Sequence, residues 1–165
     1  MDDDLEDMEG VLNFGLQKLG YSKLRDGQKR VVEAFLTGKD VFFCSPTGSG
    51  KSLCFEIAPF VFEGIAVGVD NAEKQTYISS VCLVVAPLVS LMKDQVAGLK
   101  SRGIAAAIIG PESTVAEMND IRLGRFNLLF GSPEALLNSH RTVIRDLKDS
   151  IKAVFVDESH CIAKW

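Results

Sequence analysis

Residues 40–52 read DVFFCSPTGSGKS, which is the most informative stretch of the chain for its fold class. Its first part, Asp40 to Cys44, predicts a short strand. The next part, Ser45 to Ser52, is a glycine-rich turn, and the apolar residues behind it predict a helix from about Gly50 to Gly64. A glycine-rich turn between a strand and a helix N-terminus directs backbone N–H groups toward a bound phosphate. The pattern therefore indicates an α/β protein with a phosphate-binding loop.

Two side chains of this loop carry chemistry. Lys51 is expected to reach the β- and γ-phosphates of a nucleotide, and the Ser52 hydroxyl is expected to hold Mg²⁺. The residues whose backbone would surround the phosphates are Thr47, Gly48, Ser49 and Gly50. The strict pattern of such loops has glycine six positions before the lysine, where this chain has Ser45. The position between strand and helix still favours a phosphate site over a chance Lys-Ser pair.

A second polar cluster follows the mainly apolar run Ile151 to Val156 (IKAVFV), which predicts a buried strand. Asp157 and Glu158 come directly after it, and two adjacent acids at a buried strand end are costly unless a cation compensates them. Asp157 fits a Mg²⁺ ligand, and Glu158 fits a residue that orients and activates the attacking water. Alone, such a pair is as often a helix cap; together with the phosphate loop it predicts a nucleoside triphosphatase. His160 is either structural or part of this site.

The rest of the chain alternates between helical and extended patterns. Further helices are expected over residues 5–19 and 27–36, around Leu91, Gln95 and Leu99, after the Thr114–Glu117 capping box, and from Ser132-Pro133 onward. Further strands are expected over residues 80–86, 104–109 and 126–130, and a loop over residues 69–79. This alternation predicts βαβ units, a mainly parallel sheet covered on both faces, and ligands at the carboxyl ends of its strands.

Charge does not decide the partner of this protein. The 165 residues carry a formal net charge of −4, but residues 1–9 hold six acids and no Lys or Arg, so the remainder carries +2. A local basic face is therefore permitted. The acidic N-terminus is unlike a secretory signal, which favours an intracellular protein.

Neither a membrane span nor a zinc site is expected. The most apolar stretch, residues 53–69, is interrupted by two glutamates and a proline. None of the four cysteines lies in a Cys-x-x-Cys pair, so buried free thiols are expected in place of a zinc site or a disulfide framework.

Several motifs that occur in a fixed order along the chain indicate a particular family. Residues 83–95 (LVVAPLVSLMKDQ) resemble motif Ia of the RecQ helicases, and residues 157–165 (DESHCIAKW) resemble motif II and the start of the aromatic-rich loop behind it. Residues 20–28 (GYSKLRDGQ) resemble motif 0, and residues 130–134 (FGSPE) stand where the family has a nucleic-acid-facing turn. The chain is similar to RecQ-like ATP-dependent DNA helicases of superfamily 2. The resemblance implies an acidic arm and helix over residues 1–22 and one RecA-like, three-layer helicase lobe over residues 23–165.

The resemblance also implies residue roles. Tyr21 would stack on the adenine of ATP and Gln28 would read its edge, with Arg25 assisting, although spacing alone favours a packing role for Tyr21. His160 would couple the ATP site to DNA. The residues implied to lie near the backbone of single-stranded or forked DNA are Ser90, Lys93 and Ser132; a solvated helix face is an equal alternative for Lys93. The implied activity is 3′-to-5′ movement and unwinding in DNA repair and recombination, in the nucleus of a eukaryote.

Some features depart from the family pattern. Ser159 replaces the alanine of Asp-Glu-Ala-His, and residues 67–80 resemble an insertion. The chain stops at Trp165, before the second lobe and its arginine finger, so a C-terminally incomplete motor is expected, with weak ATP binding and no unwinding by itself.

Other functions stay open beside this one. One alternative is a DEAD-box-like RNA helicase lobe, although that group has Pro-Thr-Arg-Glu at residues 87–90 and Asp in place of His160. Another is a nucleotide-binding module without motor activity. A GTPase is disfavoured, because the chain has no Asn-Lys-x-Asp motif.

Overall fold

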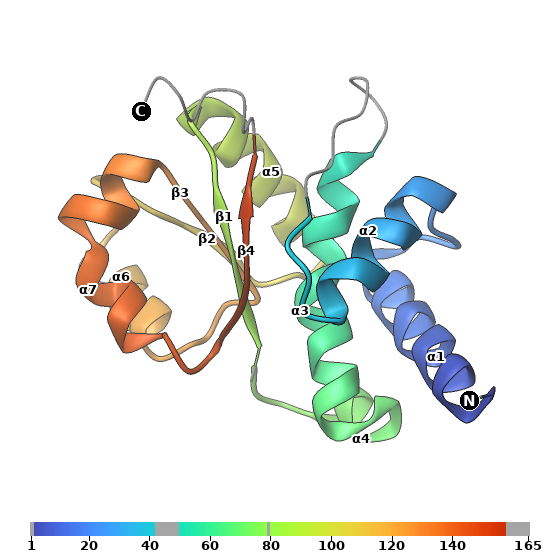
Figure 1. Cartoon of the computed structure of the whole chain (residues 1–165). Coiled ribbons are helices and arrows are strands. Elements are labelled where there is room, and N and C mark those ends of the chain that lie inside the picture. Colours follow the sequence, from blue (N-terminus) through green and yellow to red (C-terminus); the bar gives the residue numbers. More distant parts are fainter. Residues whose placement is uncertain (1, 42–49, 79, 158–165) are drawn as a thin grey trace. The chain divides into compact units, whose positions relative to one another are not determined.

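The computed structural model describes residues 2–41, 50–78 and 80–157 (Figure 1). The chain divides into two compact units, residues 1–75 and 76–165, and each is described by itself. Within the described ranges, none of the helices has the length and apolar character that crossing a membrane requires.

The first unit is helical. It contains α1 (Asp2–Leu19), α2 (Asp26–Leu36), α3 (Lys51–Val67) and α4 (Val69–Lys74). The first three confirm the predicted helices, although α3 runs on to Val67. The predicted strand at residues 40–44 falls mostly outside the described residues, and the two of its residues that are described, Asp40 and Val41, are in no strand.

Helix α4 corrects the sequence prediction, which treated residues 69–79 as an exposed loop. Gly68 has φ of 83°, so the chain turns out of α3 and begins a second helix at once. The Asn71 side chain donates a hydrogen bond to Val67 O at 2.8 Å, and Ala72 is buried. A single buried alanine is too weak a periodic signal to predict a helix from the sequence. In the structure, this alanine and the Asn71 hydrogen bond hold α4 in place.

Helices α1 and α3 pack closely against each other. Leu12, Leu16 and Leu19 of α1 are buried, as the helical spacing predicts. Gly15 lies where any Cβ would collide with Ile57 of α3, so glycine permits the close approach. The first unit is therefore built around α3.

The second unit holds the sheet. Its strands are β1 (Val81–Val85), β2 (Ala106–Ile109), β3 (Leu128–Gly131) and β4 (Ile151–Val156), in the order β2-β3-β1-β4. All of the described pairings are parallel, with Leu83 beside both Leu129 and Val154. Strand β4 confirms the predicted strand over residues 151–156, but the prediction that it is buried is wrong. This strand forms one edge of the described sheet, and its residues alternate between half-buried and exposed.

Helices cover both faces of this sheet. Helix α5 (Val89–Ser101) packs against β2 and β3, while α6 (Val115–Arg122) and α7 (Arg141–Asp146) lie on the other side (Figure 1). The core beneath α6 and α7 includes Leu83, Ile109, Ile121, Leu129 and Val143. A parallel sheet between helical layers confirms the predicted α/β, RecA-like fold.

Three details of the helices differ from the sequence prediction. Helix α5 forms as expected, but its buried stripe is Met92, Val96 and Leu99, and Leu91 is about half exposed. The segment after Ser132-Pro133 is helical, but Ala135–Ser139 forms a π-helical turn, η1. Helix α7 behind this turn lies in a polar stretch and was not predicted.

Candidate nucleotide and nucleic-acid sites

The described end of the predicted phosphate-binding loop has a backbone conformation that suits an anion. Gly50 has φ of 75° and ψ of 33°, a left-handed conformation that favours glycine, and α3 begins at the next residue. Lys51 is exposed and Ser52 half-buried on the first turn of α3, where helix N–H groups have no partner inside the helix. The other predicted residues of this loop, Thr47, Gly48 and Ser49, lie outside the described residues.

Gln28 links motif 0 to this loop within the first unit. Its side chain is buried, with 4% exposed, and its Nε2 donates a hydrogen bond to Gly50 O at 2.8 Å. Its Oε1 accepts a hydrogen bond from Arg25 N at 2.8 Å, which satisfies an N–H at the start of α2. Any Cβ at Gly50 would collide with Gln28 Nε2. Both ends of the amide are therefore engaged, but an amide has a second N–H and a second oxygen lone pair, so these two contacts do not by themselves prevent it from reading an adenine edge.

Tyr21 and Arg25 flank the start of α2. Tyr21 follows the C-terminus of α1, where its N–H donates to Leu16 O at 2.9 Å, and its side chain is 46% exposed. Arg25 is the exposed N-cap residue of α2. An exposed aromatic ring close in sequence to the phosphate-loop contact of Gln28 is compatible with base stacking. The adenine roles of these residues stay predictions.

In the second unit, polar residues follow the carboxyl ends of the strands. Because the strands are parallel, their carboxyl ends lead into loops on the same edge. Asp157 follows β4 there, and its N–H donates to Val85 O at the end of β1, at 2.8 Å. Glu158 and His160 lie outside the described residues. The predicted Mg²⁺ ligands, Ser52 and Asp157, belong to different units, and their joint role stays a prediction.

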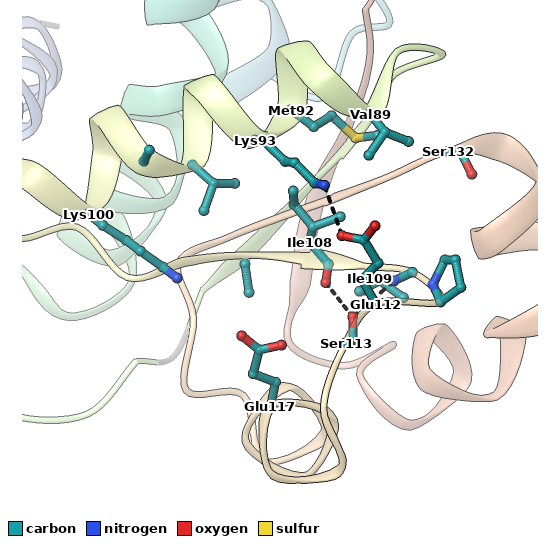
Figure 2. Close-up of a pocket in the computed structure, with 15 residues that line it drawn as sticks. Val89, Met92, Lys93, Lys100, Ile108, Ile109, Glu112, Ser113, Glu117 and Ser132 are labelled. Atoms are coloured by element: carbon teal, nitrogen blue, oxygen red, sulfur yellow. Dashed lines mark hydrogen bonds and ion pairs between the residues drawn. The ribbon is translucent and has the colours of Figure 1, made fainter.

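A groove of about 440 Å³ lies at the β2 edge of this sheet (Figure 2). Two of its lining residues, Lys93 on α5 and Ser132 after β3, were predicted to face nucleic acid. The aliphatic part of the lining includes Val89, Met92, Val96, Ala107 and Ile109. Ser90, the third predicted contact, is exposed on the first turn of α5 but is not among the lining residues. The fold thus brings two of the three predicted contacts together.

Lys93 is paired across the groove. Its Nζ lies 2.8 Å from Glu112 Oε2, and both side chains are well exposed, at 53% and 76%. The Lys93 ammonium hydrogen-bonds to the Glu112 carboxylate and attracts it electrostatically, and these effects lower the pKa of Glu112 below its ordinary value. This shift favours the carboxylate form of Glu112.

Sequence reasoning missed the loop that follows β2. Residues 110–113 line the groove and place Glu112 against Lys93. The signal was present, because residues 104–109 were expected to form a strand and loops at strand carboxyl ends are where ligands bind in such folds. The residue types of this loop, Gly-Pro-Glu-Ser, match no motif.

A family comparison gives the class of protein to which this fold belongs. The profile of the DEAD/DEAH box helicase family matches residues 25–165, and the chain belongs to that family. Within it, the chain is similar to RecQ-type DNA helicases. It is 38% identical over 151 residues to "ATP-dependent DNA helicase RecQ" of Pasteurella multocida, covering 88% of this chain and 21% of the relative. It is 35% identical over 153 residues to "Probable ATP-dependent DNA helicase RecS" of Bacillus subtilis, covering 90% and 27%.

The chain thus spans about a fifth to a quarter of the length of these curated relatives. Among solved structures, the DUF1998 helicase MrfA bound to DNA and AMPPNP matches with a TM-score of 0.65 at 21% identity, covering 91% of this chain and 21% of that one. At this identity, the match supports the fold alone.

Proposed function

We propose that this chain is the ATP-binding lobe of a RecQ-like DNA helicase, which couples ATP binding and hydrolysis to 3′-to-5′ movement on single-stranded or forked DNA. The observation that carries the proposal is the pairing of two features in one DEAD/DEAH-family chain. These are a phosphate-loop lysine on the first turn of α3 and a groove at the sheet edge that contains Lys93 and Ser132. A nuclear location is proposed for a eukaryotic member.

On the nucleotide side, the left-handed Gly50 and the open first turn of α3 suit a triphosphate. Lys51 would neutralise the β- and γ-phosphates, and Ser52 with Asp157 offers hydroxyl and carboxylate oxygens, which Mg²⁺ prefers. When bound, Mg²⁺ would neutralise the negative charge that develops during phosphoryl transfer. Tyr21, Arg25 and Gln28 would hold the adenine, Thr47, Gly48 and Ser49 would wrap the phosphates, Glu158 would orient water, and His160 would signal to the DNA side.

On the nucleic-acid side, Ser90, Lys93 and Ser132 would contact the sugar–phosphate backbone. Such contacts position a strand without reading its sequence, as a motor that moves along any DNA requires. Ser132 Oγ already accepts a hydrogen bond from Ala135 N at 3.2 Å. A hydroxyl oxygen used in this way still has its O–H to donate to a phosphate.

The test is equilibrium binding of a fluorescent ATP analogue with Mg²⁺ to the 165-residue chain and to Lys51→Ala. We expect the substitution to weaken binding about 10- to 100-fold, because a charge-assisted contact to phosphate is lost. Lys74→Ala, an exposed lysine of the same unit, is the charge-matched control and should bind as the native chain does. Equal binding by Lys51→Ala would place the nucleotide elsewhere and contradict the proposal.

A second arm tests the choice of nucleic acid. Competition between labelled oligothymidylate and unlabelled oligouridylate should show that DNA is preferred. A clear preference for the RNA would favour an RNA helicase lobe instead.

A further inference from the structure

The ion pair between Lys93 and Glu112 stands in the groove where the proposed function places a DNA phosphate. Lys93 extends from α5 and Glu112 from the loop after β2, and their charged atoms meet at 2.8 Å (Figure 2). A lysine ammonium is a compact charge with three donors, and its partners are carboxylates or phosphates. The carboxylate of Glu112 therefore occupies a position that a phosphate oxygen would take.

The loop that carries Glu112 is held on both sides. Ser113 Oγ donates to Ile108 O at 2.8 Å and accepts from Gly110 N at 3.1 Å, which closes the turn around the end of β2. Thr114 then begins α6 through a reciprocal capping box with Glu117. Pro111 further restricts the backbone inside the turn. Glu112 is thus presented from a fixed loop.

Glu112 is also the acid that balances the charge of the groove. The ionisable residues of the lining are Lys93, Lys100, Glu112 and Glu117, so the formal charges cancel. The carboxylate of Glu117 accepts a hydrogen bond from Thr114 N at 3.2 Å, at the α6 N-terminus. Glu112 instead faces Lys93. Removing its charge alone would leave the groove with a net positive charge and would release Lys93.

We propose that Glu112 sets the affinity of this groove for single-stranded DNA, by holding Lys93 in place of a backbone phosphate that must displace it. This inference rests on the proposed DNA-binding role of Lys93 and adds to it a positioning residue outside the recognised motifs. Two anions compete for one ammonium, and the displaced carboxylate then repels the phosphate nearby. The pair keeps resting affinity low, which suits a protein that must release and regain the strand repeatedly.

The experiment measures binding of fluorescein-labelled oligothymidylate to the 165-residue chain by anisotropy over a range of salt concentrations. The variants are Glu112→Gln, Lys93→Ala and the double variant, with Glu117→Gln as the matched control in the same groove. Glutamine also serves at that capping-box position, so the control changes the same charge and keeps α6 capped. Circular dichroism confirms that each variant is folded.

We expect Glu112→Gln to tighten binding about two- to fivefold at low salt, the range that an exposed ion pair supports. It should also steepen the dependence of log K on log salt by up to about 0.7, the value for one more phosphate of a single strand neutralised. Lys93→Ala should weaken binding, and in that background Glu112→Gln should have no more effect than Glu117→Gln has.

The remaining outcomes separate the two proposals. If Lys93→Ala weakens binding but Glu112→Gln acts no differently from Glu117→Gln, Glu112 is a neutral surface residue and the inference fails alone. If Lys93→Ala leaves DNA binding unchanged, the proposed DNA contact and the inference both fail.

Discussion

Helices α3 and α5 each carry a predicted functional lysine near their N-terminus, yet they are embedded very differently. In α3, all nine residues from Leu53 to Val61 are buried, and Glu63 and Gly64 are buried as well. In α5, only Met92, Val96 and Leu99 are buried, and one side of the helix lines the groove with Lys93, Ala97 and Lys100.

The difference in burial suits the two helices to two different kinds of ligand. A helix that is buried along most of its length offers only its first turn, a single point of fixed geometry, which suits a terminal phosphate group. A helix that is buried along one stripe offers a long side to solvent, which suits an extended polyanion. Substitutions in α3 should therefore act on stability, and substitutions on the outer side of α5 should act on binding.

The largest effect is expected for the free energy of unfolding when one side chain of each helix is truncated to alanine. Ile57→Ala in α3, where the side chain is fully buried, should lower the free energy of unfolding by about 2–5 kcal/mol, because it leaves a cavity. Leu91→Ala on α5, where the side chain is 49% exposed, should change it by no more than about 0.5 kcal/mol. Urea unfolding followed by circular dichroism measures both. Similar losses would mean that the two helices are equally embedded.

A second test uses thiol chemistry on the same two helices. Desolvation by burial raises the pKa of Cys54 in α3 from 9.0 to about 11, so its thiol stays protonated at a pH where an exposed thiol has ionised. Alkylation by iodoacetamide requires the thiolate, and at pH 9 Cys54 should react about 100-fold more slowly than the thiol of an Ala97→Cys variant on α5. Peptide mass mapping separates the two sites.

The pH profile sharpens this test. The rate at Cys54 should still rise between pH 9 and 11, while the rate at the introduced thiol levels off. Because the unfolded chain loses this proton first, the same shift makes folding less favourable as pH rises from 9 to 11. Parallel pH profiles would show that α3 opens readily.

The smallest effects are expected for glycine substitutions in α1, which test how closely α1 packs against α3. Gly10 and Gly15 both lie in α1, but a Cβ at Gly10 meets nothing within 4 Å, whereas one at Gly15 collides with Ile57. Gly10→Ala should stabilise the protein by up to about 1 kcal/mol through helix propensity. Gly15→Ala should destabilise it by about 1 kcal/mol, because overpacking outweighs that gain. Stabilisation by both variants, measured as urea midpoints, would contradict the close packing of α1 on α3.

Local signals made most of the fold predictable. The apolar spacing of α1 and the capping box of α6 depend on residues three or four positions apart, and the strands are short apolar runs. The errors arose where local signals were weak. Helix α4 has a single buried residue, Ala72. The buried stripe of α5 includes Met92 and Val96 because that stripe faces β2 and β3. The η1 turn places Leu136 beside Gly131, a contact that sequence spacing does not reveal.

The α/β class and the helicase family could be predicted from the sequence, because each rests on residues close together in the chain; the same local patterns nominate Lys51, Ser52 and Asp157, whose roles stay predictions. Tertiary structure alone decided that Gln28 meets Gly50, and that Lys93, Glu112 and Ser132 share one groove. The physical reason is that a parallel sheet leads the carboxyl ends of its strands into loops on one edge, whatever the sequence distance between them. Which side chains meet there depends on strand order and helix rotation, and both follow from packing.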